Sequence, residues 1–269
     1  MTPNPSSGSV SFDRAAGFYD STRSHSPEVE ARVNDLLNAE LAGRGWCLEI
    51  GVGTGRVALP LYRSGLPLVG VDISSKMVDR LVEKAGGRRP FPLVLADATA
   101  LPFADGTFGA GIAAHVFHLI PPWQRGVAEL ARVVRPGGVV LVTLGGAGGE
   151  LFRGVRDRFA AAAGLERVHV GVEDSDELDA CFAALGATGR DLPRVVEPGR
   201  ISLERLIASF ERAEFSYTWR MDEETRHRAA REVRAWAQAT YGSLKKVRPT
   251  SSTVAWRAYD LPGAASGEQ

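Results

Sequence analysis

Acidic side chains and alternating glycines follow the first apolar segment of this 269-residue sequence. The segment Cys47 to Ile50 is typical of a buried strand with Glu49 near its end, and Gly51, Gly53 and Gly55 alternate in the turn that follows. Glycine accepts positive φ and lets a ligand approach the backbone closely. A strand, a glycine-rich turn and a helix N-terminus form the nucleotide-binding corner of α/β sheets. The segment therefore predicts a nucleotide site and leaves the nucleotide open.

Polar residues also end the next apolar segments. Asp72 ends the second predicted strand, Asp97 ends the third, and His115 follows the fourth. Ligands of open parallel sheets bind at the carboxyl ends of the strands, so these side chains are expected along one edge with Glu49. Asp72 could accept two hydrogen bonds from ribose hydroxyls. Two alternatives remain: the aspartates cap the helices that follow them, and Glu49 binds local backbone amides.

Hydrophobic periodicity supplies the elements that position these residues. Five apolar strands, at 46–50, 66–71, 91–96, 108–114 and 139–144, alternate with helical segments. This alternation predicts a parallel sheet covered by helices on both faces. Ser26 and Pro27 mark a helix start, and Arg135 to Gly138 predicts a sharp turn. Beyond residue 144, helices are expected at 150–163, 175–185, 202–212 and 222–241, with a final strand at 253–259.

Composition excludes several classes of protein. Lys plus Arg and Asp plus Glu both number 32, so no general attraction to nucleic acid or to an anionic membrane is expected. The sequence has no apolar run long enough for a transmembrane helix. Cys47 and Cys181 lie far apart, which argues against a disulfide framework and fits a reducing cytoplasm. His169 and His227 lack companions at metal-ligand spacing, so no metal is predicted.

The ordered motifs resemble those of class I S-adenosylmethionine-dependent methyltransferases. They are the first motif at Glu49 to Gly55, the second at Val71 to Ser74 with Met77, the third at Ala96 to Ala98 with Leu101 to Phe103, the fourth at Phe108 to Leu119, and the strand-five motif at Leu130 to Val142. The resemblance covers about residues 12–144. Within that family, the sequence resembles the subgroup of small-molecule methyltransferases related to the enzymes of ubiquinone and menaquinone biosynthesis. Phe18 to Asp20 with Arg23 resembles that subgroup's N-terminal helix, which closes over the cofactor.

The resemblance implies a role for each matching position. Gly51, Gly53 and Gly55 would pass close to the methionine part of S-adenosylmethionine, and Glu49 would support the turn and the amino group. The other implied cofactor-binding residues are Asp72 for the ribose, Ile73 against the adenine, Met77 of the second motif, Asp97 and Ala98 at the adenine edge, and Tyr19 and Arg23 at the methionine end.

His115 is the candidate general base, since an imidazole could take a proton from a hydroxyl acceptor. The alternative is that no base acts, because the sulfonium is already a strong electrophile and the enzyme supplies alignment. His118 is interpreted as structural. An aromatic cluster in the region 145–220 either lines an acceptor pocket or forms a core of its own; it comprises Phe152, Phe159, Phe182, Phe210, Phe215, Tyr217 and Trp219.

The expected fold is α/β: a doubly wound, Rossmann-like, seven-stranded and mostly parallel sheet with a helical cap and an antiparallel last strand. One methyltransferase domain is expected at 12–262, with an N-terminal lid at 12–42, the cofactor-binding core at 46–144, a cap and C-terminal elements at 145–262, and flexible tails at 1–11 and 263–269. The expected function is methyl transfer to an O, N or C nucleophile of a small molecule.

Two other functions stay open at this point. Gly53 to Ala58 also satisfies G-x-G-x-x-A, which permits an NAD(P)-dependent oxidoreductase. The second open function is that of a protein with this fold that binds the cofactor but transfers no methyl group. The oligomeric state is left open.

Overall fold

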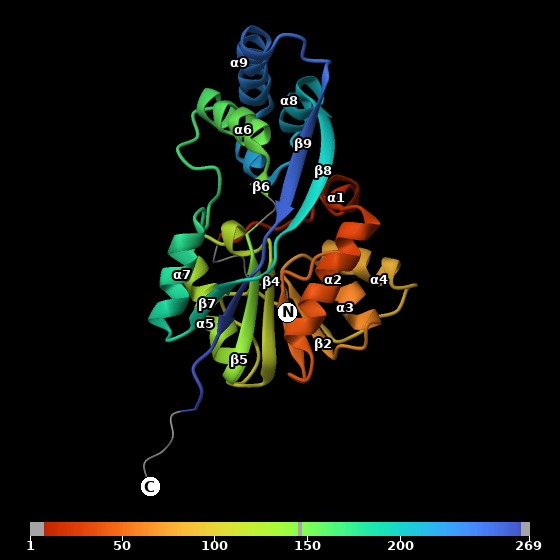
Figure 1. Cartoon of the computed structure of the whole chain (residues 1–269), viewed down its shortest axis with the longest axis vertical. Coiled ribbons are helices and arrows are strands. Elements are labelled where there is room, and N and C mark those ends of the chain that lie inside the picture. The colour runs from red at the N-terminus through yellow and green to blue at the C-terminus, as the bar shows by residue number, and fades with distance from the viewer. Residues whose placement is uncertain (1–7, 145–146, 265–269) are drawn as a thin grey trace. The chain divides into compact units, whose positions relative to one another are not determined.

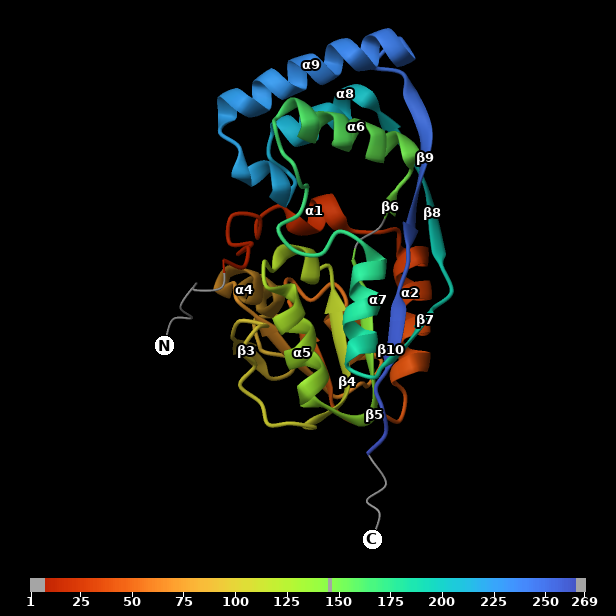
Figure 2. The same ribbon diagram turned by 90° about the vertical axis from the view of Figure 1, so that its left-hand side faces the viewer.

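The computed structural model describes residues 8–144 and 147–264 and divides the chain into two compact units, each described here by itself. Of these residues, the first unit contains 8–144, 171–194 and 255–264, and the second contains 147–170 and 195–254. The predicted cap and C-terminal elements, 145–262, are divided between the two units. Residues 171–194 and the C-terminal residues belong to the unit that holds the predicted core. The chain is coloured by residue number in Figures 1 and 2.

The first unit is built on a seven-stranded sheet in the order β3-β2-β1-β4-β5-β10-β7. Its strands are β1 (Cys47–Ile50), β2 (Leu68–Asp72), β3 (Leu93–Leu95), β4 (Phe108–Ala114), β5 (Val134–Thr143), β7 (Thr188–Asp191) and β10 (Arg257–Asp260). β1 to β5 run parallel, whereas β10 pairs antiparallel with both β5 and β7. This order confirms the predicted doubly wound, mostly parallel sheet with an antiparallel last strand.

Helices lie on both faces of this sheet. They are α1 (Tyr19–Arg23), α2 (Pro27–Leu41), α3 (Ala58–Arg63), α4 (Ser75–Lys84), η1 (Phe117–Leu119), α5 (Trp123–Val133) and α7 (Ser175–Ala184). Figure 1 shows α2, α3 and α4 on one side of the sheet and α5 and α7 on the other. The Ser26 side chain accepts a hydrogen bond from the Val29 amide and caps α2, with Pro27 in the first turn as predicted.

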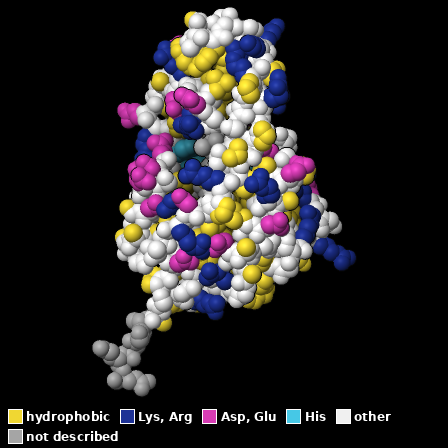
Figure 3. All heavy atoms as spheres, viewed as in Figure 1, with side chains coloured by type: hydrophobic (Ala, Val, Ile, Leu, Met, Phe, Trp, Pro, Cys, Tyr) yellow, Lys and Arg dark blue, Asp and Glu magenta, His cyan; other side chains and the backbone are white. Residues whose placement is uncertain are grey.

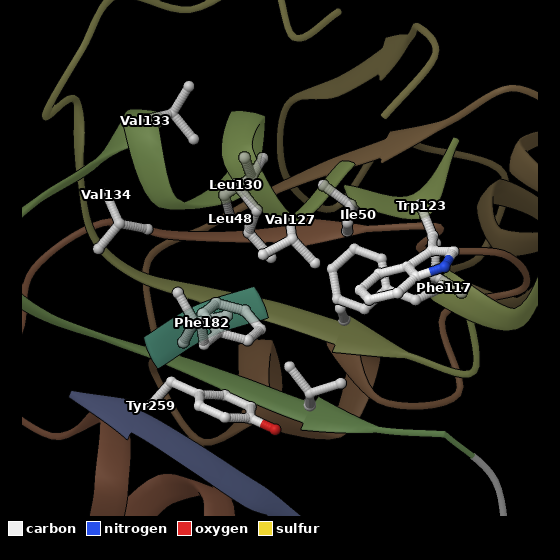
Figure 4. Packing of buried hydrophobic residues seen from close by; sticks show 14 of the residues in the cluster. Leu48, Ile50, Phe117, Trp123, Val127, Leu130, Val133, Val134, Phe182 and Tyr259 are labelled. Atoms are coloured by element: carbon white, nitrogen blue, oxygen red, sulfur yellow. The ribbon is translucent and has the colours of Figure 1, made fainter. Parts of the chain in front are cut away.

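One residue from each of four neighbouring strands fills the face under α5 and α7. These residues are paired in register and all belong to one buried cluster: Val71, Ile50, Ala113 and Val142. Phe182 of α7 joins them and stacks on Tyr259 of β10, with ring centroids 3.9 Å apart (Figure 4). Because side chains alternate along a strand, the residues next to these four point to the opposite face.

The second unit combines helices with a small antiparallel sheet. Its elements are β6 (Ala147–Gly148), α6 (Glu150–Ala162), β8 (Val195–Ser202), α8 (Leu203–Glu211), η2 (Ser216–Arg220), α9 (Glu223–Tyr241) and β9 (Val247–Val254), and the strand order is β6-β9-β8. Most of the predicted aromatic cluster packs in this unit's own core: Phe152, Phe159, Phe210, Phe215 and Tyr217. Phe182 lies in the first unit's core instead. Packing is therefore the role the structure gives these rings.

Two predicted boundaries are wrong. The expected final strand, 253–259, is divided, because β9 ends at Val254 in the second unit and β10 begins at Arg257 in the first. The fifth strand was expected to begin at 139, whereas β5 begins at Val134. The expected turn, 135–138, interrupts the pairing of β5 with β4, and Gly137 has a φ of 72° there.

The predicted N-terminal tail is fixed in part. The Val10 amide donates a hydrogen bond to the Leu119 carbonyl at 3.0 Å. Residues 1–7 and 265–269 of the predicted tails lie outside the described residues.

Candidate functional site

The turn after β1 requires glycine for two physical reasons. Gly51, Gly53 and Gly55 have φ values of 61°, 54° and 75°, a backbone region that residues other than glycine rarely adopt. A Cβ atom on Gly51 would lie 2.3 Å from Cγ2 of Val116, and one on Gly55 would lie 2.8 Å from Cγ of Leu59. The predicted glycine turn is therefore a tight backbone cradle at the carboxyl end of β1.

Asp72 is tied to this turn by its side chain. Its Oδ2 accepts a hydrogen bond from the Gly53 amide and its Oδ1 accepts one from the Ser74 amide, each at 2.8 Å. A carboxylate has about four acceptor sites, and the Ile73 amide also acts on this group, so capacity for a ligand donor remains beyond the backbone bonds. Burial raises the pKa of Asp72, and the hydrogen bonds from backbone amides oppose that effect. Asp72 is not the cap of α4, because Ser74 accepts the capping bond from Met77.

Glu49 is buried, and its Oε2 has no hydrogen-bond partner among the described residues. Burial raises the pKa of Glu49 well above its ordinary value of 4.5, and the nearby charge of Arg56 and a backbone hydrogen bond from Ala58 oppose the rise. A buried polar atom without a partner is costly in a folded protein. Glu49 therefore only partly fits the alternative that it serves local amides, because one oxygen remains available.

The strand register places the two carboxyl groups on one face. Glu49 precedes Ile50 and Asp72 follows Val71, and these two neighbours face α5 and α7. Glu49 and Asp72 consequently point to the opposite face, on either side of the glycine turn. The structure thus brings together three parts of the predicted site.

The predicted adenine-side residues follow β2 and β3, which are neighbours in the sheet. Oδ1 of Asp97 accepts hydrogen bonds from the Thr99 amide at 2.9 Å and from its hydroxyl at 2.8 Å, and the half-buried Ala98 lies between them. Ile73 is half-buried directly after Asp72. The Met77 methyl carbon would lie 3.3 Å from a Cβ on Gly53, so Met77 packs against the turn.

The N-terminal helix is fastened to the turn by a network that the sequence analysis did not identify. Asp20 of α1 accepts a hydrogen bond from the Thr54 hydroxyl at 2.6 Å and forms a 3.1 Å ion pair with Lys84 of α4. Arg56 donates to the Arg23 carbonyl at 2.6 Å. Thr54 is the one residue with a hydroxyl in the glycine turn, so the sequence could have suggested a polar contact there. Its partners are distant in sequence, and the residues around them do not indicate the contact.

Tyr19 and Arg23 lie in α1, beside these anchoring contacts. The Tyr19 ring packs edge-on against Phe12, with centroids 5.8 Å apart. The structure therefore places both residues next to the turn, as the resemblance implies, and their contacts with a cofactor stay predictions.

His115 directly follows β4 with a backbone φ of 58°, which is unusual for any residue except glycine. Its amide donates to the Thr143 carbonyl at 2.8 Å. Burial, followed by the charges of Arg56, His118, Arg23 and His25, lowers the pKa of His115 well below 6.5. The imidazole is therefore uncharged at neutral pH and carries a lone pair that can accept a proton.

Within residues 8–144 and 147–264, no group of three or more His, Cys, Asp and Glu side chains could hold a metal ion. No helix in the same ranges is long and apolar enough to cross a bilayer. Cys47 and Cys181 are both free thiols.

Comparison with known proteins agrees with this geometry. Residues 48–142 match the family model described as a methyltransferase domain. The chain is 41% identical to a phosphatidylethanolamine N-methyltransferase of Cereibacter sphaeroides, over 36% of this chain and 49% of that protein. It is 30% identical to a demethylmenaquinone methyltransferase of Corynebacterium urealyticum, over 53% of this chain and 61% of that protein. The chain therefore spans about half to three-fifths of the length of these relatives.

The fold comparison covers more of the chain. The crystal structure of the YcgJ protein from Bacillus subtilis superposes with a TM-score of 0.58 at 18% identity, over 88% of this chain and 99% of that one. The match at such low identity concerns the fold. Residues 48–142 thus match a methyltransferase domain, and the fold that contains them is Rossmann-like.

Proposed function

We propose that this protein uses S-adenosylmethionine to methylate a small molecule. The observation that carries the proposal is the glycine cradle of β1 joined by hydrogen bonds to the buried Asp72 carboxylate. Such a carboxylate, with acceptor capacity left beyond its backbone bonds, suits a ribose hydroxyl. A family match over the same residues supports it.

The chain's own groups fit the parts of this cofactor. The orphaned Oε2 of Glu49 is an acceptor or donor beside the turn, where the amino group of the methionine part would lie. Asp97 and Ala98 follow β3, next to the strand end that carries Asp72, and suit the adenine edge. Tyr19 and Arg23 are held beside the turn by the Asp20–Thr54 hydrogen bond and suit the methionine end.

S-adenosylmethionine, when bound, supplies an electrophilic methyl group on a sulfonium. The protein's contribution is to hold the acceptor in line and to exclude water from the reacting atoms. His115 serves as the base that removes the proton of a hydroxyl acceptor. Burial lowers the pKa of His115, so the ring is neutral at physiological pH; the same shift makes it a weaker base, and it takes the proton as the methyl group is transferred.

The partner we propose is a small-molecule methyl acceptor rather than nucleic acid or membrane. The formal charge of the whole chain is zero, and acidic and basic side chains are interspersed over much of the face in Figure 3. Phosphate backbones and anionic lipids require a surplus of positive charge. The free thiols of Cys47 and Cys181 support a reducing cytoplasmic compartment.

The first prediction concerns Asp72. We expect D72A to weaken S-adenosylhomocysteine binding about 100-fold, or roughly 3 kcal/mol, because charge-assisted bonds to the ribose are lost. D79N, at an exposed position of α4, is the matched control and should bind as the wild type does. Isothermal titration calorimetry measures both, with circular dichroism to confirm folding. Unchanged affinity in folded D72A would remove Asp72 from the site.

The second prediction concerns His115. We expect H115N to lower kcat about 100-fold while leaving the dissociation constant of S-adenosylhomocysteine unchanged, because only the base is lost. Asparagine tolerates the positive φ at this position, so the backbone should keep its path. S-adenosylhomocysteine formation with a phenolic acceptor such as catechol is the measurement. Wild-type turnover by H115N would reject the base.

The third prediction concerns the pH dependence of stability. The folded protein holds the Glu49 proton at pH values where the unfolded chain has lost it. The free energy of unfolding of the ligand-free protein should therefore fall as pH rises above about 4.5. E49Q should flatten that part of the profile, whereas D35N, at an exposed site on α2, should not. Urea denaturation between pH 5 and 8 tests this, and parallel profiles for E49Q and wild type would contradict it.

A further inference from the structure

Thr143, the last residue of β5, carries a buried hydroxyl in the first unit. The residue is 2% exposed, and its Oγ1 has no hydrogen-bond partner among the described residues. Buried hydroxyls in native proteins are almost always bonded, and an orphaned one destabilises the fold. Valine would fill the same volume without that cost. Among the described residues, this hydroxyl therefore keeps an open hydrogen-bonding position that a bound molecule could use.

The strand register places this hydroxyl on the side of the sheet that holds the candidate site. Val142, the preceding residue, faces α5 and α7 together with Val71. Thr143 and Asp72 each follow one of these residues, so they point to the opposite face at the same level of the sheet. Three strand spacings separate β2 from β5, or about 14 Å at ~4.8 Å each. Thr143 thus lies beyond the ribose and methionine positions, at the acceptor end of the row.

The candidate base is fixed directly beside it. The amide of His115 donates to the carbonyl of Thr143 at 2.8 Å, in the strained conformation described above. Strained backbone at a strand end is typical of functional sites, where the surrounding structure holds it. The hydroxyl of Thr143 and the ring of His115 are consequently carried by hydrogen-bonded neighbouring segments.

The position of His115 beside Thr143 indicates which kind of acceptor these groups would suit. A hydroxyl acceptor gives up its proton to a base, and its oxygen becomes anionic as the proton leaves. A threonine hydroxyl can donate to such an oxygen.

We propose that the Thr143 hydroxyl is a specificity-determining group that donates a hydrogen bond to an oxygen atom of the methyl acceptor, which belongs to the hydroxyl-bearing class rather than the amines. The proposal rests on the methyltransferase function proposed above. It adds a second contact beside His115 and names the chemical class of the substrate.

The test compares T143V with T143S in the full chain. The oxygen probes are catechol, 4-hydroxybenzoate and 1,4-naphthohydroquinone, and the amine probes are benzylamine and ethanolamine. We expect the wild type to form S-adenosylhomocysteine with an oxygen probe and not with the amines. T143V should raise the acceptor KM about 10-fold, whereas T143S, which keeps the hydroxyl, should stay within about threefold of wild type.

Two further readouts separate this role from a structural one. T143V should melt at the same temperature as the wild type or higher, because it removes an orphaned hydroxyl. T218V is the matched control: the buried Thr218 donates to the Phe215 carbonyl at 2.6 Å, so its loss should lower the melting temperature without changing KM. Calorimetry should give both variants the wild-type affinity for S-adenosylhomocysteine.

Three results would overturn the proposal. An unchanged acceptor KM in T143V would remove the hydroxyl from the acceptor site. Preference for an amine, or no turnover of any oxygen probe by a protein that binds S-adenosylhomocysteine, would refute the assigned class. A wild-type protein that fails to bind S-adenosylhomocysteine would refute the proposed function itself, together with the inference that rests on it.

Discussion

The buried carboxylate of Asp72 joins the ends of the two strands on which the candidate site depends. By accepting the amides of Gly53 and Ser74, it fixes the glycine turn after β1 to the start of α4. A charged group is stable at such depth because these hydrogen bonds compensate for its lost hydration. The turn, the helix and the ribose-binding position we propose are therefore consequences of one interaction, and the Asp20–Thr54 bond adds the N-terminal helix to it.

The core of the fold follows from the sequence because its strands are short, apolar and bounded by turn residues. The predicted fourth strand, 108–114, coincides with β4, and Ser26 and Ser74 cap their helices through side-chain bonds of the kind that the capping rules describe. The C-terminal strand could not be predicted correctly, because alternation between 253 and 259 continues while the chain passes from one sheet to the other. Hydrophobic periodicity indicates that a segment forms a strand, but it does not indicate which strand pairs with it.

The candidate site was predictable where spacing along one segment determines geometry, as for the three glycines and for Glu49. Contacts between distant segments were not. Lys84 and Asp20 form an ion pair although they are far apart in the sequence, and the residues around each of them do not indicate this contact. Thr143 could not be identified from the sequence for a different reason. A threonine at the end of an apolar strand is common, and only the structure shows that its hydroxyl is buried without a partner among the described residues. Orphaned polar atoms are properties of packing, which a sequence does not display.

The central claim is that the glycine turn and Asp72 form a site for S-adenosylmethionine, and binding of its demethylated product tests that claim most directly. The full chain would be titrated calorimetrically with S-adenosylhomocysteine and, in parallel, with NADH, since Gly53 to Ala58 also fits the spacing of a dinucleotide fingerprint. We predict micromolar binding of S-adenosylhomocysteine and none of NADH. Binding of NADH alone would contradict the account and assign the same turn to a redox cofactor.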